Sequence, residues 1–297
     1  MDVNPTRALD RDHDSLERFV FEDAPIHGRV VHLDATWRAV LERRAYPEPV
    51  RELLGEFMAA AALLTAIDGR LILQVQSNGP VRLLVVECSS ERAMRALAQW
   101  HGEVKPMPFS QLLGHGRLVI TIDPQQGKER YQGVVELEGD SVAQVLEGYF
   151  KRSEQLDTRI WLASDTEHAA GMILQKLPDR ESEDSDIWDR AAHLGSTLTR
   201  DELLTLPARD ILHRLYHEED IRLFQRVPVS FRCTCTRSGV ERALHMMGEG
   251  EVRSILKEKG RVDIDCEYCG SHYELDTVEI EQLFAVGHTT ETERTRH

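Results

Sequence analysis

The chain has 297 residues and carries 36 Lys and Arg against 51 Asp and Glu, which gives a formal net charge of −15. A chain of this length can bury one large hydrophobic core and form one or two smaller units. Its negative charge repels phosphate groups over most of the surface, so nucleic acids and anionic membranes are disfavoured as partners.

The start of the chain and its apolar stretches indicate the cellular compartment of the protein. The chain from Met1 onward has neither the basic nor the apolar region of an export signal. The longest apolar stretch, residues 57–67, is interrupted by Thr65 and falls short of the roughly 20 residues that a membrane-spanning helix needs. We therefore expect a soluble cytoplasmic protein, and in that compartment clustered cysteines more often indicate metal or redox chemistry than structural disulfides.

The first part of the chain mixes strand and helix patterns. Strands are expected at residues 29–33, 71–75, 81–86, 116–122, 130–137, 158–162 and 170–177. Asn78 and Gly79 separate the second of these strands from the third and tolerate the positive φ of a hairpin turn. Helices are expected at residues 35–44, 50–66, 91–100 and 141–149. These elements predict an α+β core domain over residues 1–178, with a mainly antiparallel sheet.

The composition changes after residue 178. Residues 179–230 hold 12 acidic and 7 basic side chains, and the acidic run at residues 181–186 is expected to be a solvated linker rather than a metal site. A capping box of Thr199 and Glu202, and Pro207 at a first helical position, predict helices after that run. Their buried side is expected to be a narrow apolar stripe made of Leu203, Leu204, Ile211, Leu212 and Leu215. We expect a metastable helical linker over residues 179–230 that depends on docking to stay folded.

Four of the five cysteines lie in the last 67 residues, as Cys233-x-Cys235 and Cys266-x-x-Cys269. Two thiol pairs on two arms can supply the four soft ligands of a tetrahedral zinc site, and the same pairs could also close as two local disulfides. A hairpin of residues 261–265 and 272–275 is expected around the second pair, with helices near residues 252–259 and 277–286. We assign residues 231–297 to a small zinc-binding domain, which needs the metal because its own core is small.

The purpose of the metal has two interpretations. In the first, the zinc is purely structural, as in a zinc-ribbon interaction or regulatory protein. In the second, the site is a redox switch. A disulfide across one residue, as in Cys233-x-Cys235, is strained and easily reversed, and zinc-held thiolates are open to peroxide. Oxidation would then eject the zinc and unfold the domain.

Other candidate residues are expected to have plain structural roles. Cys88 follows an apolar strand and is interpreted as a buried packing residue. His272 is assigned to a strand, because four thiolates already fill a tetrahedron, and residues 248–250 are interpreted as a turn. No combination of nucleophile, base and orienting acid can be assembled, so the sequence does not support an enzyme.

Across essentially its whole length, the chain resembles the bacterial thirty-three-kilodalton heat-shock protein family of redox-regulated chaperones. The resemblance is carried by motifs in matching order, which are Asp68-Gly69-Arg70-Leu71, Gln74-Val75-Gln76, Gly79-Pro80, Arg130-Tyr131-Gln132-Gly133-Val134-Val135, Tyr149-Phe150-x-x-Ser153-Glu154-Gln155-Leu156, Ala169-Ala170-Gly171-Met172, Leu203-Leu204-Thr205-Leu206-Pro207, Leu215-Tyr216-His217-Glu218-Glu219, Phe231-x-Cys233-x-Cys235 and Cys266-x-Tyr268-Cys269-Gly270.

The resemblance implies an ATP-independent holdase that binds unfolding proteins and prevents their aggregation under oxidative and heat stress. It implies one Zn²⁺ per chain, held by Cys233, Cys235, Cys266 and Cys269 in the inactive, reduced form. Activation would convert these residues to Cys233–Cys235 and Cys266–Cys269 disulfides, release the zinc and unfold the linker. Dimerisation on activation and handover of clients to ATP-dependent foldases are further expectations. We also expect the linker to cover the client-binding surface of the core.

Overall fold

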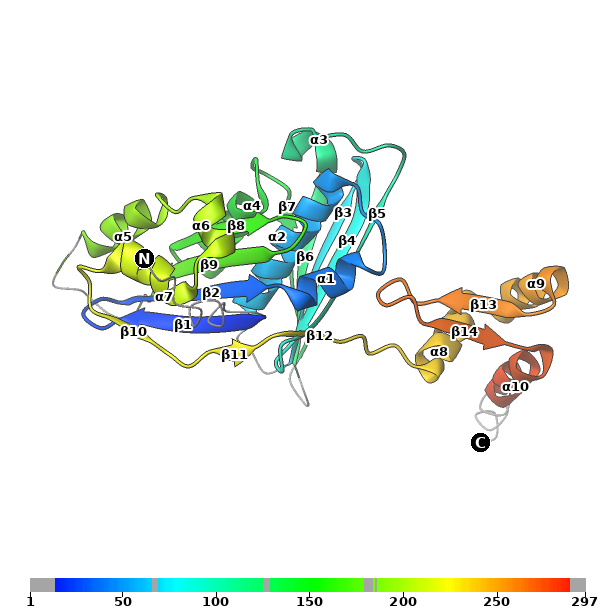
Figure 1. The fold of residues 1–297 in the computed structure, drawn as a ribbon. Helices are drawn as coiled ribbons and strands as arrows, with labels where there is room; N and C mark the ends of the chain where they lie inside the picture. Colours follow the sequence, from blue (N-terminus) through cyan, green and yellow to red (C-terminus); the bar gives the residue numbers. More distant parts are fainter. Residues whose placement is uncertain (1–13, 66–68, 125–128, 179–183, 185, 289–297) are drawn as a thin grey trace, which may run out of the picture. The chain divides into compact units, whose positions relative to one another are not determined.

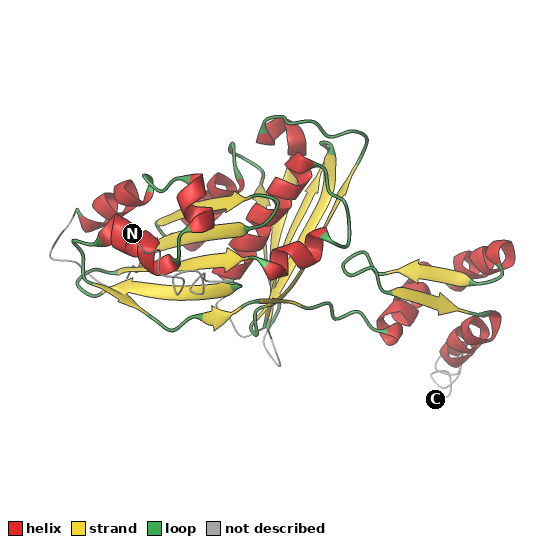
Figure 2. Cartoon of the chain, in the orientation of Figure 1, coloured by secondary structure: helices red, strands yellow, loops and turns green. Residues whose placement is uncertain are grey.

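The computed structural model describes residues 14–65, 69–124, 129–178, 184 and 186–288. The chain divides into two compact units, residues 1–232 and 233–297, which are considered separately (Figure 1). Helices and antiparallel strands occur in both units (Figure 2). The start of the chain at Met1, and most of the acidic run at residues 181–186, lie outside the described residues. None of the described helices is long and apolar enough to cross a membrane.

The first unit contains two sheets. The first sheet is antiparallel and runs in the order β10-β1-β2-β9-β8, with β11 also paired to β1. Its strands are β1 (Ser15–Phe21), β2 (Ile26–Leu33), β8 (Thr158–Ser164), β9 (Ala169–Lys176), β10 (Ile221–Leu223) and β11 (Val227–Pro228).

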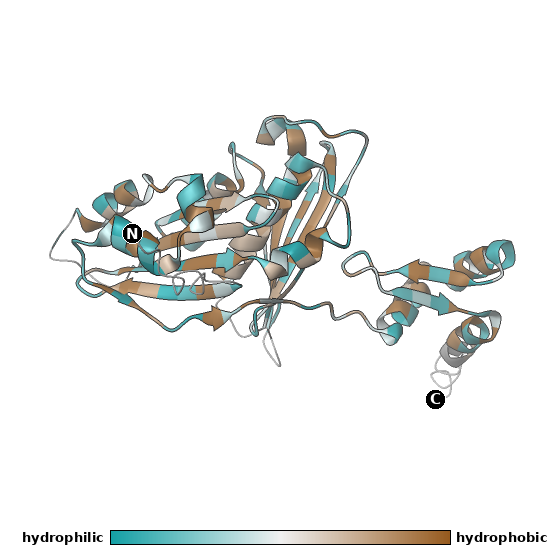
Figure 3. Cartoon of the chain, viewed as in Figure 1, coloured by the Kyte–Doolittle hydropathy of each residue, from teal (hydrophilic) through white to brown (hydrophobic). Residues whose placement is uncertain are grey.

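The second sheet runs in the order β12-β5-β4-β3-β6-β7. All its pairs are antiparallel except that of β12 with β5. Its strands are β3 (Arg70–Ser77), β4 (Val81–Ser89), β5 (Ala93–Trp100), β6 (Gly116–Asp123), β7 (Tyr131–Glu136) and β12 (Ser230–Phe231). The Asn78-Gly79 turn joins β3 to β4, as the sequence predicts, and hydrophobic residues run along these strands (Figure 3).

Helix α2 (Glu48–Leu64) packs against both sheets, with β2, β8 and β9 on one side and β3, β4 and β5 on the other. It is buried on several faces, because Leu54, Phe57 and Met58 are fully covered and Ala59, Ala60, Ala61 and Ala62 let the strands approach closely. The remaining helices of the sheet region are α1 (Ala35–Leu41), α3 (Phe109–Leu113) and α4 (Val142–Tyr149), which continues as the single π-helical turn η2 (Phe150–Glu154).

Three short helices cover the other face of the first sheet: α5 (Ile187–Gly195), α6 (Arg200–Thr205) and α7 (Ala208–Tyr216) (Figure 1). The predicted capping box begins α6, with both reciprocal hydrogen bonds between Thr199 and Glu202. The predicted stripe is buried, and it packs on sheet residues that include Phe19, Phe21, Val30, Met172 and Leu174. These helices therefore hide a continuous apolar sheet face.

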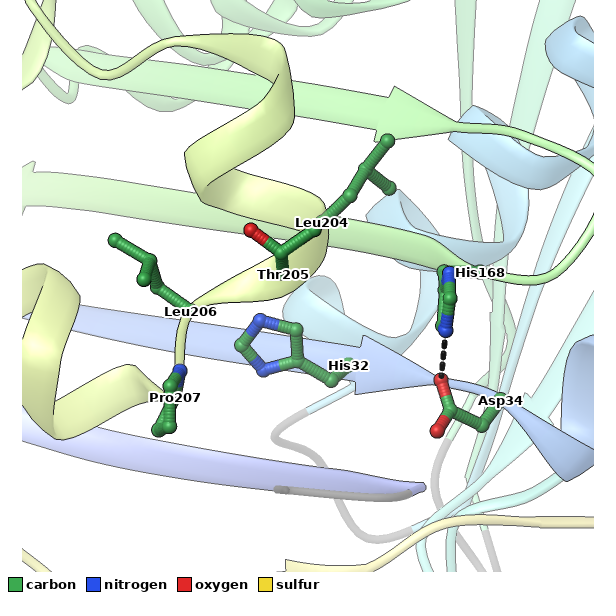
Figure 4. Close-up of a pocket in the computed structure, with 7 residues that line it drawn as sticks. All are labelled: His32, Asp34, His168, Leu204, Thr205, Leu206 and Pro207. Carbon is green, nitrogen blue, oxygen red and sulfur yellow. Dashed lines mark ion pairs between the residues drawn. The ribbon is translucent and has the colours of Figure 1, made fainter. Parts of the chain in front are cut away.

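Polar contacts add to this docking. The Nε2 atom of His32 lies 3.0 Å from the carbonyl oxygen of Leu203, at a small cavity of about 50 Å³ where the α6–α7 connection crosses β2 (Figure 4). Tyr216 donates a hydrogen bond of 3.1 Å to the carbonyl of Ala191, which ties α7 to α5. Arg200 pairs with Glu52 of α2 at 3.3 Å and donates to the carbonyl of Ser164.

The second unit consists of α8 (Arg237–Met247), α9 (Glu249–Lys259), the hairpin of β13 (Val262–Asp265) and β14 (His272–Leu275), and α10 (Thr277–His288). The hairpin and α9 agree with the sequence expectation, and α10 extends it. Its buried core is small and comprises Leu244, Val252, Val262, Leu275, Ile280 and Phe284. So small a core gives this unit little stability of its own.

Two sequence predictions are wrong. The helix expected at residues 91–100 is the strand β5, because Arg92 adopts a left-handed conformation (φ 59°) and the following residues pair with β4 and bury Met94, Ala96 and Ala98. Pairing with β4 here outweighs the local helix propensity of these residues. The turn expected at residues 248–250 is confined to Gly248 (φ 98°), and α9 starts at the next residue.

The fold disfavours the ionised form of the Glu56 carboxyl group in α2. Burial, and then the neighbouring Glu52, raise its pKa to about 7, and Arg200 opposes this rise only in part. Replacing Glu56 with Gln should therefore stabilise the first unit at pH values above about 7. The unfolded chain loses this proton near pH 4.5 and the folded protein near pH 7, so the parent loses stability as the pH rises between these values.

Because the Glu56 side chain is half-buried, we expect Glu56→Gln to raise the free energy of unfolding by about 1–2 kcal/mol at about pH 8 and to leave it unchanged at about pH 4. Urea unfolding at both pH values measures the difference. Glu136→Gln, at an exposed position of β7, is the control. An equal gain in the control, or a gain that does not depend on pH, would contradict the assignment.

Candidate metal centre

The first pair of cysteines lies between a strand and a helix. Cys233 follows β12 after one residue, and Cys235 directly precedes Thr236, the N-cap of α8. The Thr236 hydroxyl accepts a hydrogen bond of 3.1 Å from the Gly239 amide, which fixes the start of the helix. The cap of α8 thus begins at the residue that follows Cys235.

The second pair lies on the turn of the β13–β14 hairpin. The amide of Cys266 donates to the Ser271 carbonyl at 2.9 Å, and the amides of Cys269 and Gly270 donate to the Cys266 carbonyl at 3.3 and 2.7 Å. Gly270 has a φ of 70°, which suits a residue without a Cβ atom. The turn therefore directs both sulfurs to one side of the hairpin.

The four sulfur atoms form one cluster. Each Sγ lies within 4.8 Å of the others, with 3.7 Å between Cys233 and Cys266 and 3.4 Å between Cys235 and Cys269. None of the four cysteines is in a disulfide, and both of these contacts join one arm to the other. Metal–sulfur bonds of about 2.3 Å in a tetrahedron place the sulfurs about 3.8 Å apart. The cluster therefore has the size of a four-thiolate metal site.

The protonation of the thiols also favours a cation. Burial opposes ionisation of Cys269, but its hydrogen bonds with Ser271 and the neighbouring thiols of Cys235 and Cys233 lower its pKa to about 6. Burial, with a smaller contribution from the hydrogen bonds to Cys269 and Cys233, raises the pKa of Cys266 to about 12. The pKa values of these two neighbouring thiols therefore move in opposite directions, and a cation among the sulfurs would favour the thiolate form of both.

Two side chains support the sulfurs, and sequence reasoning does not identify either of them. The Tyr273 hydroxyl donates to Cys235 Sγ at 3.1 Å, and Ser271 Oγ lies 3.1 Å from Cys269 Sγ. Such contacts orient ligands and tune their basicity. Packing of the arm that holds Cys235 against the hairpin brings the two residues together, since 38 residues separate them in sequence.

The other candidate residues lie apart from this cluster. Cys88 is fully buried in β4, and burial raises the pKa of its thiol to about 11. The His272 ring lies 2.7 Å from Asp265 and 3.4 Å from Asp263, so it pairs with carboxylates on the hairpin rather than with the sulfurs. Asp263, His272 and Glu274 form a second group of metal-type side chains, but all three are exposed and Arg261 already pairs with both carboxylates.

Comparison with known proteins gives one consistent family. A model described as Hsp33 protein matches residues 14–276. A 33 kDa chaperonin of Methylobacillus flagellatus is 47% identical over 276 residues, which cover 91% of this chain and 94% of that protein. One of Chromobacterium violaceum is 48% identical over 290 residues, covering 96% and 98%.

The fold is also found in a solved structure. The crystal structure of the 33 kDa chaperonin (heat shock protein 33 homolog) of Thermotoga maritima matches with a TM-score of 0.79 and covers 93% of this chain and 99% of that chain. At 22% identity, this likeness concerns the fold alone. Because the family match spans the two sheets, the covering helices and all four clustered cysteines, this chain belongs to the Hsp33 protein family, a family of molecular chaperones.

Proposed function

We propose that this protein is a redox-regulated, ATP-independent holdase. It binds unfolding proteins and prevents their aggregation when oxidation and heat activate it. The observation that carries the proposal is the four-sulfur cluster, which joins the two arms of a unit that has little core of its own. Chemistry at these sulfurs thus decides whether the unit stays folded.

Zinc is the metal that fits this cluster best. Four thiolates are soft ligands, and Zn²⁺ accepts them in a closed tetrahedron without redox chemistry of its own. The protein would hold one Zn²⁺ per chain in the reduced, inactive form, through Cys233, Cys235, Cys266 and Cys269. Closed coordination of this kind leaves no position for a substrate, which agrees with a role that is not enzymatic.

Oxidation releases the metal in this proposal. Each pair of zinc-held thiolates gives up two electrons to one molecule of peroxide, which takes two protons from the solvent and becomes two molecules of water while a sulfur–sulfur bond forms. A disulfide sulfur is a poor zinc ligand compared with a thiolate, so two disulfides leave the ion without ligands. We infer bridges within each arm, Cys233 with Cys235 and Cys266 with Cys269, which form as the arms separate.

The client-binding surface would be the sheet face under α5, α6 and α7. These helices bury large apolar side chains of β1, β2 and β9, among them Phe19, Val30 and Met172. Short helices of this kind are unstable once they leave the sheet. Undocking would therefore expose an apolar surface that can hold an unfolded chain.

The proposal divides the chain into a core at residues 1–178, a metastable linker at 179–230 and a zinc-binding redox switch at 231–297. The cytoplasm suits it, because thiols stay reduced there until stress oxidises them. Dimerisation on activation and handover of clients to ATP-dependent foldases complete the proposed cycle.

The first prediction of the proposed function concerns the metal. The reduced protein should bind one zinc per chain, and Cys266→Ser should lose most of it because three thiolates do not close the tetrahedron. Cys88→Ser should keep full occupancy, since Cys88 lies in β4 of the other unit. Metal analysis of the purified reduced variants gives the answer. Full zinc occupancy in Cys266→Ser would exclude Cys266 as a ligand.

The second prediction concerns activation. Peroxide at elevated temperature should release the zinc, form the two bridges within the arms, and turn an inactive protein into one that suppresses aggregation of a thermally unfolded client. Zinc release, peptide mapping and client light scattering are measured on the same samples. Zinc release without chaperone activity would favour the alternative of a zinc-ribbon interaction protein with a structural metal. Bridges mainly between the arms, such as Cys235 with Cys269, would refute the inferred connectivity.

The third prediction concerns the covering helices. Leu212→Asp places a carboxylate in the buried interface of α7, which should cost at least about 3 kcal/mol of docking free energy. The variant should act as a holdase while reduced and zinc-loaded, and residues 187–223 should become sensitive to protease. Arg209→Asp introduces the same side chain on the exposed side of α7 and should stay inactive. A protease-sensitive Leu212→Asp protein without holdase activity would contradict the covering role.

A further inference from the structure

Helix α7 presents two histidines one turn apart near its C-terminal end. His213 and its C-cap residue His217 are both exposed, and their rings lie with centroids 6.0 Å apart and planes inclined by 29°. Side chains at positions i and i+4 share one face of a helix. Two imidazoles in this arrangement can both direct a ring nitrogen at one ion, as in helical zinc motifs.

The pair borders an open hollow of about 610 Å³ between α7 and β10. Its charged lining consists of Arg209, Glu219, Asp220 and Arg222. Glu219 pairs with Arg190 at 2.8 Å and Arg222 with Glu22 at 3.0 Å. Asp220 lines the same hollow as the two rings, so the charges around them are of both signs.

We propose that His213 and His217 form a second metal site, which takes a divalent transition ion of the Zn²⁺ or Ni²⁺ type. Imidazole nitrogens are preferred ligands of these ions, whereas Ca²⁺ and Mg²⁺ require mainly oxygen ligands. Bonds of about 2.0–2.1 Å hold two ligand nitrogens about 3–4 Å apart, a spacing that rotation of two exposed rings can reach. Water molecules complete the coordination. The negative end of the α7 dipole adds a favourable field.

The site has a consequence for the covering helices. An ion bound across one turn of α7 favours the helical form of that segment, because the unfolded chain does not hold the two rings together. Metal at this site therefore opposes undocking of α7 from the first sheet. Opposition to undocking would also oppose activation, and this effect rests on the proposed holdase function. The metal binding itself does not rest on it.

The test uses the full-length, reduced protein with its cysteine site loaded with zinc. Ni²⁺ is titrated by calorimetry while zinc retention is measured, so that exchange at the sulfurs is counted separately. The parent should bind one further equivalent, and both His213→Ala and His217→Ala should lower its affinity at least tenfold. His193→Ala, which removes an exposed histidine of α5, should bind Ni²⁺ as the parent does. Far-UV circular dichroism checks that each variant keeps its helices.

Absence of a further Ni²⁺ equivalent in the parent, unchanged affinity in His213→Ala, or an equal loss in His193→Ala would overturn the site. A second measurement addresses its consequence. Ni²⁺ should slow protease cleavage within residues 187–223 in the parent severalfold and have no effect in His213→Ala. If Ni²⁺ binds but does not slow protease cleavage, the metal site stands and its stabilising effect on α7 is refuted. Holdase activity is not a readout of either arm, so failure of the proposed function is distinguishable from failure of this site.

Discussion

The structure depends above all on the burial of one sheet face under three short helices. Helices α5, α6 and α7 have six to nine residues each, too few to persist alone in water. The sheet needs them equally, since β1, β2 and β9 direct aromatic and aliphatic side chains at them. The T-shaped contact of Phe21 with Tyr216, with centroids 5.2 Å apart, is one point where each side covers the other. Separating the two surfaces would therefore expose apolar area of both to water, which costs free energy.

The opposite face of the same sheet is built differently. There, α2 is enclosed by strands of both sheets and is part of the main core. Loss of α2 would unfold the unit, whereas loss of α5 to α7 would expose one face of an otherwise intact sheet. The two sides of this sheet are therefore covered differently, by one long helix of the main core and by three short helices, and the second side is the one that the proposed holdase function would use.

The chain that leads to the cysteines is paired with both sheets. After α7 it adds β10 and β11 to β1, and then β12 to β5. Phe231 lies under the Arg43 guanidinium at 4.2 Å, and the Arg232 amide donates to the Met94 carbonyl at 2.9 Å, directly before Cys233. Short strands therefore connect the covering helices to the chain that leads to Cys233.

The sequence by itself determined the features that depend on neighbouring residues. Thr199 and Glu202 predict the start of α6, and Asn78-Gly79 predicts the turn of the β3–β4 hairpin. The spacing of the four cysteines predicts a cluster of sulfurs. Tertiary structure alone decided the rest. Residues 93–100 have helical composition but form β5, because pairing with β4 outweighs local preference. The contact of Tyr273 with Cys235 joins separate parts of the chain, and the burial that raises the pKa of Glu56 depends on solvent exclusion. Neither the contact nor the burial can be predicted from local sequence, because both arise only when distant segments pack together.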